Sequence, residues 1–412
     1  MRVHVIGAGV AGMACALRVA RAGVPVTLYE AAAQAGGRCR SVENPSLGRI
    51  DNGTHLFLGA NHGVFDYLSA IGARNGLTAL APARFPFRDL ASGAAWNLQP
   101  NAGRFPWWIL RPERRVAGSR AHHYLAALRL MRARPATTVA EAVGANPLHD
   151  RLWRPLCEAV LNTEPEVASA RLLGDALAAT LLHGEAASRP YVAAVNLTDA
   201  FVTPGLAALS VLGADMRFRH PLRGLAMAER VTSLSFPQGA VAIGPRDRVV
   251  LAVPWWAARR LLPWLPSLPG RAVVNAHFRL PNGSVAAPRL IAAVGGTSQW
   301  MLLRNGLVSV TVSAADALVA ENSEALARRI WAETAAVLAI APAFPSVWKI
   351  IKERRATIAH TPALLAARPA ATTPIPNLWL AGDWTDTGWP CTVEGAVQSG
   401  HAAAKLVAAT LP

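Results

Sequence analysis

The amino-acid sequence predicts an α/β protein in which one nucleotide-binding domain is assembled from separate parts of the chain around an inserted α+β domain. Two glycine-containing motifs, one near each end of the chain, indicate the nucleotide-binding domain. The long region between them carries mostly helical patterns and differs from both ends. The chain has 412 residues, more than one compact core usually accommodates, so we expect at least two structural units.

The N-terminal segment opens as a β-α-β unit. Residues 2–6 predict a buried strand and residues 13–22 a helix, joined by the motif GxGxxG. Gly7 permits the tight turn, Gly9 lets the backbone approach a pyrophosphate, and Gly12 lets helix and strand pack closely. The free N–H groups of the helix then face the phosphates.

An acidic residue completes this unit. Residues 24–29 predict the second strand, and Glu30 follows it, 18 residues after Gly12, where it can accept a hydrogen bond from a ribose hydroxyl. Strand, helix and acid in register predict a Rossmann-like dinucleotide site, and Ala11 within the motif is also expected to contact the ligand. The alternative is that the glycines only serve packing.

Two further segments offer backbone and charge to the same ligand. Gly37 and Arg38 follow a second glycine, and a guanidinium there can bind a diphosphate; a solvated basic loop is the alternative. Asn52, Gly53 and Thr54 place short polar residues beside a glycine, as expected where backbone passes close to a flat ligand.

The C-terminal segment carries the second motif. Residues 377–380 predict a short buried strand, followed by Gly382 and Asp383 at its carboxyl end and then by a helix of small residues. The aspartate can bind ribityl hydroxyls, and the helix N-terminus can stabilise the pyrimidine end of a reduced flavin. We therefore predict FAD as the cofactor. Three residues around the start of this helix and one earlier residue are also expected to contact it: Thr392, Val393, Ala396 and Leu222.

The two motifs lie nearly 380 residues apart, so the FAD-binding domain is predicted to be discontinuous. We assign to it residues 1–75, 204–260 and 355–412. Residues 76–203 and 261–354 form the predicted substrate-binding domain, of which the first part is a mostly helical insert. Helices are expected at 119–134, 139–143, 148–161, 166–183 and 323–338, and strands at 249–254, 272–279, 300–303, 307–312 and 346–354.

The composition limits the partners. Lys and Arg number 41 against 25 Asp and Glu, a net charge of +16, which favours an anionic partner such as nucleic acid, a phosphate-bearing ligand or a membrane surface. No nucleic-acid-binding module is recognisable, so nucleic acid is not expected. The four cysteines form no CxxC pair, which indicates neither a metal site nor disulfides and fits a reducing cytoplasm. No apolar stretch reaches the ~18 residues of a membrane-spanning helix.

These motifs resemble those of the amine oxidase and phytoene desaturase superfamily of FAD enzymes, which carry GxGxxG, a GGR segment and a terminal GD followed by EGA. The resemblance implies an amine-oxidase-like, GR2-type architecture. The chain is most similar to the squalene-associated FAD-dependent desaturases, or hydroxysqualene dehydroxylases, of hopanoid biosynthesis. The segments that carry this likeness are residues 37–41, 51–55, 100–104, 107–108 and 380–384.

Two departures weaken the amine oxidase alternative. Amine oxidases usually have an aromatic residue two positions before the glutamate of EGA, where this chain has Thr392. They often use a lysine near the flavin, and this chain has only Lys349, Lys352 and Lys405. A carotenoid-type desaturase stays open as an alternative, although such enzymes are typically longer.

The resemblance implies reductive removal of a hydroxyl from the C30 alcohol hydroxysqualene, giving squalene, with hydride supplied by reduced flavin N5. The leaving oxygen needs a proton. We expect the donor among His55, Asp51 and Asp386, which flank the flavin-facing motifs, although a lone histidine such as His55 is more often structural. Only one GxGxxG is present, so the electron donor is expected to be external, and prenyl synthases of the squalene pathway are potential functional partners.

A water-insoluble substrate must be collected from a bilayer. Trp107, Trp108, Trp255, Trp256 and Trp264 lie among arginines, which is the composition of an interfacial anchor. The alternative is that these tryptophans line the core or a substrate tunnel. We predict a cytoplasmic enzyme in peripheral contact with the anionic inner face of the membrane.

Overall fold

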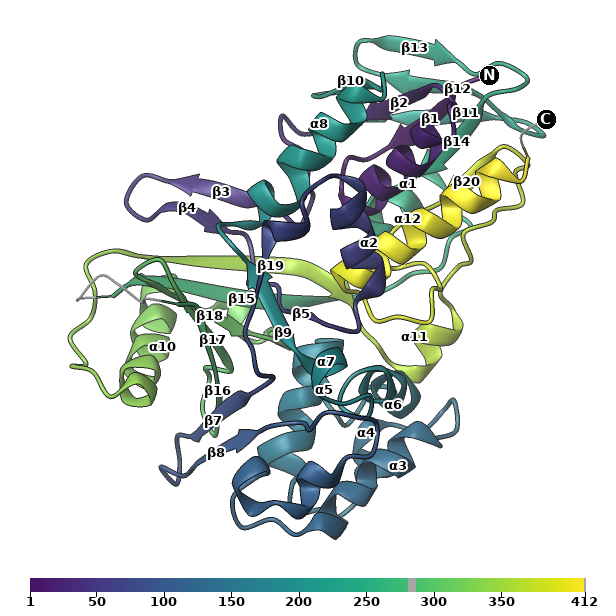
Figure 1. Cartoon of the computed structure of the whole chain (residues 1–412). Helices are drawn as coiled ribbons and strands as arrows, with labels where there is room; N and C mark the ends of the chain where they lie inside the picture. The colour runs from purple at the N-terminus through teal and green to yellow at the C-terminus, as the bar shows by residue number, and fades with distance from the viewer. Residues whose placement is uncertain (281–286, 411–412) are drawn as a thin grey trace.

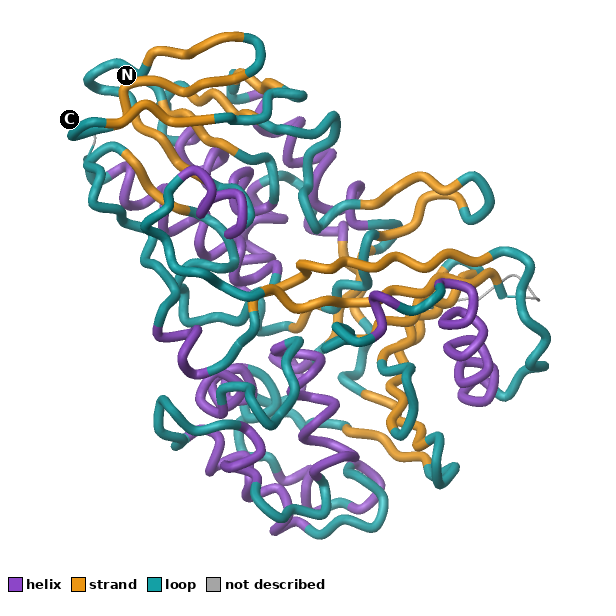
Figure 2. Tube along the Cα trace, turned by 180° about the vertical axis from the view of Figure 1, so that it is seen from behind, coloured by secondary structure: helices purple, strands orange, loops and turns teal. Residues whose placement is uncertain are grey.

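The structure, a computed structural model, describes residues 1–280 and 287–410 of the chain. Three parts are visible in Figure 1: a unit built on a parallel sheet at one end, long antiparallel strands across the middle, and a helical insert at the other end. Figure 2 shows the same arrangement from behind, with the strands of the middle part lying between the two helical regions.

A five-stranded parallel sheet forms the core of the first unit, in the order β10-β2-β1-β14-β20. Its strands come from the start, the middle and the end of the chain: β1 (Val3–Ile6), β2 (Val26–Tyr29), β10 (Asp215–Arg217), β14 (Arg248–Leu251) and β20 (Leu378–Leu380). Because β14 pairs with both β1 and β20, the discontinuous domain predicted from the two terminal motifs is confirmed.

Side chains alternate between the two faces of this sheet. Val5 and Val250 contact the helices on one face, whereas Val249 and Leu251 lie in the apolar cluster on the other face. The helices are α1 (Val10–Arg21), α2 (His62–Ala70), α8 (Thr203–Val211) and α12 (Val393–Ala408). The other face is covered by the antiparallel strands β11 (Gly224–Met227), β12 (Val231–Phe236) and β13 (Gly239–Ala242), and by α9 (Trp255–Leu261).

A seven-stranded sheet forms the second unit, in the order β19-β15-β18-β17-β16-β7-β8. Its strands are β7 (Phe85–Asp89), β8 (Ala95–Leu98), β15 (Gly270–Arg279), β16 (Arg289–Val294), β17 (Trp300–Arg304), β18 (Leu307–Val312) and β19 (Trp348–Ile358). The helix α10 (Ser323–Leu338) packs on one face through the apolar cluster around Trp331.

The helical insert packs against the β7 end of this sheet around Trp153 and Leu173. Its elements are the 3-10 helices Trp107–Leu110, Pro112–Arg114 and Ala121–Leu125, the π-helix His149–Trp153, α3 (Ala126–Met131), α4 (Val139–Val143), α5 (Arg154–Leu161), α6 (Ala170–Ala179) and α7 (Glu185–Ser188). Within the described part of the chain, no helix is both long enough and apolar enough to cross a membrane.

The remaining elements connect these parts. They are β3 (Ser41–Asn44), β4 (Gly48–Asp51), β5 (Phe57–Leu58), β6 (Leu77–Ala79), β9 (Pro190–Ala193), α11 (Pro362–Ala366), the 3-10 helices Arg74–Gly76 and Leu318–Ala320, and the π-helix Thr198–Val202.

The sequence located the periodic elements better than the short ones. The bounds predicted for α4 and α10 are confirmed. The expectation that residues 76–203 are mostly helical missed β7 and β8, which pair with each other and extend the second sheet. Residues Ala200, Phe201 and Val202, assigned to the substrate-binding domain, pack in the core of the parallel-sheet unit; apolar residues in a short helix do not reveal which core they fill.

The closest packing between the two ends of the chain is at Gly400. A Cβ atom built on this residue of α12 would lie 2.2 Å from the carbonyl oxygen of Ala11 in α1, and one built on Gly12 would lie 1.9 Å from the carbonyl oxygen of Gly7. Only hydrogen at both positions allows α1 to lie against α12 and against the turn after β1.

We predict that Gly400→Val destabilises the protein strongly, because the added side chain forces α1 and α12 apart. The expected loss in the free energy of unfolding is about 3 kcal/mol, measured by urea denaturation. Gly224→Ala is the matched control: nothing lies within 4 Å of a Cβ at Gly224, so its effect should stay within about 0.5 kcal/mol. Equal stability of the two variants would contradict the packing argument.

Candidate functional site

The GxGxxG turn has the geometry expected of a phosphate-binding loop. Gly7 has φ +109°, and a Cβ there would lie 2.4 Å from the carbonyl oxygen of Ala252, so only glycine fits. Gly9 is the N-cap residue of α1, and nothing lies within 4 Å of a Cβ built on it. The space beside Gly9, at the N-terminus of a twelve-residue helix, suits a pyrophosphate.

Glu30 and the second glycine pair border this turn. The Glu30 carboxylate accepts hydrogen bonds from the Ala8 and Ala32 N–H groups, both at 2.9 Å. Gly36 forms a parallel bridge with Gly9, and a Cβ on Gly37 would lie 3.4 Å from the Gly9 Cα atom. The structure therefore brings together the turn, the acid and the Gly36–Gly37 segment that the sequence predicted separately.

Arg38 and Asp383 form an ion pair. Arg38 Nη2 lies 2.5 Å from Asp383 Oδ1, and Arg38 also donates to the carbonyl of Ala356. The guanidinium lies 5.8 Å from the centre of the Trp255 ring. The N-terminal and C-terminal motifs thus meet in space, and contact of Arg38 with a diphosphate stays a prediction.

Asp51 is committed to neighbouring donors. Its Oδ1 accepts from the Ser41 hydroxyl at 2.7 Å and from the Leu197 N–H at 2.8 Å, and its Oδ2 lies 2.7 Å from Arg304 Nη2. All three partners are donors, so Asp51 acts as an acceptor in this structure.

The following segment is held by a residue that sequence reasoning missed. Asn275 on β15 is buried, donates to the Asn52 carbonyl and accepts from the Thr54 N–H, both at 3.4 Å, and also accepts from the Thr311 hydroxyl at 2.8 Å. A Cβ on Gly53 would lie 3.3 Å from the Asn275 amide nitrogen. An asparagine between the apolar residues Val274 and Ala276 was the available signal.

His55 lies within electrostatic reach of both motifs. Burial lowers the pKa of His55; the Asp51 carboxylate opposes that shift, the Arg38 guanidinium reinforces it, and Asp383 makes a smaller contribution that also opposes it. Asp386, in contrast, is exposed and lies in the loop after Asp383. Of the three expected proton donors, His55 is the one placed beside the paired motifs without an ion-pair partner among the described residues.

The loop after Asp383 is held by Arg368, a second residue missed from sequence. Arg368 is buried and donates to the main-chain carbonyls of Asp383, Trp384, Thr385 and Trp389. These carbonyls belong to a loop without helix or strand, and the Arg368 guanidinium satisfies them with charge-assisted hydrogen bonds.

His360 holds the end of the same loop. Its Nδ1 donates to the carbonyl of Leu161 at 2.6 Å, and its Nε2 accepts from the Cys391 N–H at 2.9 Å, an arrangement that requires the neutral ring. Burial lowers the pKa of His360 to about 4. A lone histidine gave no signal in the sequence.

The N-terminus of α12 follows. Thr392 is the N-cap residue, and its hydroxyl accepts from the Gly395 N–H; Val393 is buried and Ala396 is half-buried in the first turns. Glu394, which the motif EGA contains, accepts from the Gly63 and Val64 N–H groups at the start of α2, so its carboxylate stabilises that helix terminus.

Two other predicted residues lie further along the fold. Gly382 has φ +149°, and its N–H donates to the Ser399 hydroxyl at 2.9 Å, which fixes the GD turn to α12. Leu222 is buried between the parallel sheet and β12, in the cluster that contains Tyr29. Its contact with a cofactor stays a prediction.

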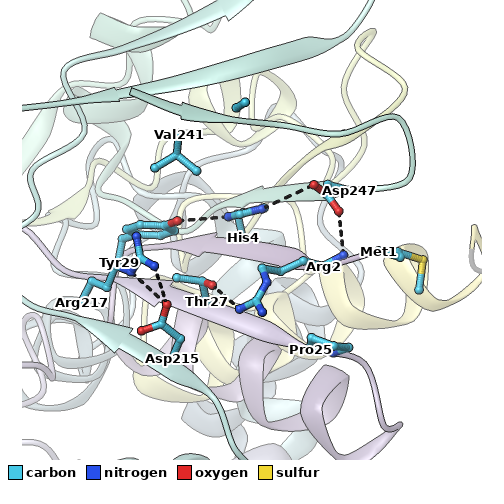
Figure 3. Close-up of a pocket in the computed structure, with 11 residues that line it drawn as sticks. Met1, Arg2, His4, Pro25, Thr27, Tyr29, Asp215, Arg217, Val241 and Asp247 are labelled. Carbon is cyan, nitrogen blue, oxygen red and sulfur yellow. Dashed lines mark hydrogen bonds and ion pairs between the residues drawn. The ribbon is translucent and has the colours of Figure 1, made fainter. Parts of the chain in front are cut away.

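A pocket of about 520 Å³ lies on one face of the parallel sheet, beside β13 (Figure 3). Its lining runs from Arg2 and Thr27, near the starts of β1 and β2, to Tyr29, the last residue of β2, and includes none of the residues expected to bind the cofactor. His4 Nδ1 lies 3.2 Å from the Tyr29 hydroxyl, and Arg2 donates to Thr27 at 2.9 Å. Its polar groups bind one another, and it is separate from the candidate site.

The residues present fit a dinucleotide flavin. The open space beside Gly9 suits the phosphates, the Glu30 carboxylate borders the position of a ribose, and Asp383 lies at the end of β20 beside α12. No cluster of histidine, cysteine and acidic residues that could hold a metal ion occurs among the described residues.

We predict that His360 makes stability depend on pH. Because its pKa is lower in the folded protein than the ordinary value of 6.5, the unfolded chain binds this proton more readily, and stability is lost as pH falls from about 6.5 towards 4. Between these pH values, His360 alone changes the free energy of unfolding by about 3 kcal/mol. In urea denaturation between pH 7 and 5, His360→Gln should show a shallower pH dependence than the unsubstituted protein. Parallel curves would contradict this assignment.

Comparison with known proteins agrees with this geometry. Residues 10–408 match the model of the family described as flavin containing amine oxidoreductase. A protein of Rhodopseudomonas palustris named hydroxysqualene dehydroxylase is 43% identical over 99% of this chain and 98% of its own length. A zeta-carotene desaturase of Synechocystis is 24% identical over 99% of this chain and 97% of its own length.

The fold is similar to that of putrescine oxidase, with a TM-score of 0.73 and 16% identity over 99% of both chains. This likeness confirms the amine-oxidase-like architecture, and the family confirms the predicted flavin cofactor. The chain therefore belongs to the flavin containing amine oxidoreductase family, within the group of the hydroxysqualene dehydroxylases that its motifs predicted.

Proposed function

We propose that this protein is an FAD-dependent oxidoreductase that removes the hydroxyl of hydroxysqualene reductively and releases squalene. The observation that carries this proposal is full-length similarity to a relative of that name, far above the similarity to a zeta-carotene desaturase. The GxGxxG, GGR and GD segments, which belong to the motifs of this family, also meet in one site. The reaction replaces the hydroxyl with a hydride and consumes one proton, which leaves with the hydroxyl as water.

When bound, FAD supplies the hydride. The chain's residues supply binding, orientation and the proton. Glu30 and the turn at Gly9 bind the dinucleotide, and Arg368 and His360 hold the loop between β20 and α12 in place.

His55 is our candidate for the proton donor. Its side chain is half-buried, and the carboxylates of Asp51 and Asp383 favour its protonated form. Because burial lowers the pKa of His55, its imidazolium is a stronger acid than that of an exposed histidine, and turnover should fall as pH rises through this pKa. Exposed Asp386 can exchange protons with solvent and is the weaker candidate.

The test is an anaerobic assay with the FAD-loaded protein, chemically reduced flavin and hydroxysqualene, in which squalene is measured by mass spectrometry. We expect squalene from the unsubstituted protein. His55→Gln should lower the rate by about 10²-fold or more and remove the decline at high pH. Formation of a desaturated product instead of squalene would overturn the proposed function. An unchanged rate of His55→Gln would only exclude His55 as the proton donor.

We also propose a membrane-binding surface on the helical insert. Its exposed apolar side chains are Phe105, Trp107, Leu110, Leu125 and Leu128. Phe105 is 74% and Leu110 61% exposed, and the rings of Trp108 and Tyr124 pack at 5.5 Å, which brings the two segments together. Arg104, Arg111 and Arg114 lie among them, and Arg114 stacks on the Trp107 ring at 4.9 Å.

This surface combines the features of peripheral membrane binding. Apolar side chains can enter the interfacial region, and arginines can bind anionic headgroups. Trp108 and Trp255 are buried and serve the core, whereas Trp256 and Trp264 are 43% and 48% exposed. The expectation of an interfacial anchor is therefore restricted to the exposed tryptophans. The cytoplasmic location, the external electron donor and the prenyl synthase partners stay predictions.

We predict that replacing Phe105 and Leu110 with Ser lowers binding to phosphatidylglycerol vesicles about tenfold, because two insertion points are lost. Vesicle flotation at two salt concentrations measures the change, and binding should weaken as salt increases. Val211→Ser is the matched control, since Val211 is 88% exposed but lies on α8 of the other unit. Equal flotation with neutral and anionic vesicles would contradict the proposed binding of anionic headgroups by the arginines.

A further inference from the structure

The seven-stranded sheet has two chemically different faces. Alternate side chains of β15 and β18 pack against α10 and form an apolar face: Val274, Ala276, Phe278, Val308 and Val310. The side chains between them point to the opposite side. They include Asn275, His277, Ser309 and Thr311, which we call the polar face. A polar face inside an enzyme for a hydrocarbon-like substrate needs a polar partner.

The polar face lies against the segment predicted to border the flavin. Asn275 exchanges hydrogen bonds with Asn52 and Thr54. His277 follows Asn275 by two residues on the same face of β15, about 7 Å further along the strand. Asp51 is a charged neighbour of both His277 and the candidate proton donor His55. The two histidines therefore border the same region of the protein.

His277 carries an unsatisfied polar atom. The residue is 1% exposed, and its Nδ1 lies 2.8 Å from the Ser309 hydroxyl oxygen, which fixes the orientation of the ring. Among the described residues, no atom forms a hydrogen bond with Nε2; the main chain of Asp51 lies nearby without the required geometry. Buried polar atoms are rarely left unpaired, so a polar atom of a ligand is the partner to look for.

The charge of His277 selects the kind of ligand. Burial lowers its pKa to about 4, the Arg304 guanidinium reinforces this shift and the Asp51 carboxylate opposes it. Arg304 and Asp51 pair with each other at 2.7 Å, so neither leaves an unbalanced charge beside the ring. A neutral imidazole offers Nε2 as a donor or an acceptor according to its tautomer. A hydroxyl can take either part, which makes an uncharged alcohol the matching ligand.

We propose that His277, oriented by Ser309, recognises the hydroxyl of the substrate through a hydrogen bond at Nε2. The proposal rests on the proposed function and names the residue that distinguishes the alcohol from the hydrocarbon product. His277 binds the hydroxyl oxygen while the proton comes from another group. Loss of the hydroxyl removes the partner of Nε2, which favours exchange of squalene for the next alcohol.

The experiment compares the binding of hydroxysqualene and squalene in detergent micelles to the FAD-loaded protein with oxidised flavin, which cannot turn over. The change in flavin absorbance gives both dissociation constants. His277→Leu should weaken hydroxysqualene binding about tenfold, as expected for one lost hydrogen bond, and leave squalene binding within about twofold. His277→Gln, whose amide can still bind a hydroxyl, should recover most of the affinity.

Two further variants keep the outcome clear. Ser309→Ala keeps the His277 ring but removes the hydrogen bond that orients it, so hydroxysqualene affinity should fall less than in His277→Leu and squalene affinity should not change. This variant replaces His277→Leu as the test if His277→Leu does not fold. His183→Leu, at an exposed histidine, is the control and should change neither constant. An equal change for alcohol and hydrocarbon, or no change in Ser309→Ala and His277→Leu, would overturn the inference. Failure of the proposed function can be distinguished from failure of this inference, because it would appear as absence of squalene in the reductive assay.

Discussion

The close contact between α1 and α12 is the constraint on which the remaining structure depends. Gly400 allows the backbone of α12 to meet the backbone of α1 at Ala11, and this contact closes a domain whose parts are almost the whole chain apart. With α12 fixed, Ser399 holds the turn at Gly382, and Asp383 reaches Arg38. The ion pair between the two motifs therefore depends on the helix contact at Gly400 and on the hydrogen bond from Gly382 to Ser399.

Irregular backbone in the site is held by buried polar side chains. Arg368, His360 and Asn275 each bind main-chain groups of a segment that has no sheet or ladder of its own. Unpaired main-chain groups are costly when buried, so these side chains set the shape of the loops. The site is thus rigid although it is made mostly of turns.

The sequence predicted what depends on local pattern. The glycine spacing of β1 to α1, the GD turn after β20 and the period of α10 are properties of short segments, and each was found where it was expected. The two terminal motifs were predicted to share a domain, but the individual pairings were not predictable, because nothing local shows that β7 joins β16 or that Arg38 meets Asp383. His277 and Arg368 were missed for the same reason: their roles arise only from neighbours that folding brings together.

The position of the helical insert bears on how substrate, product and reductant would reach the site. The helical insert, which carries Phe105 and the exposed side chains around it, lies at the end of the molecule opposite the parallel sheet (Figure 1). A molecule resting on lipid through this end holds its nucleotide-binding turn towards the aqueous phase. In the membrane-bound state proposed above, the water-insoluble substrate and product would exchange on the lipid side, and an external reductant would reach the flavin from the aqueous side.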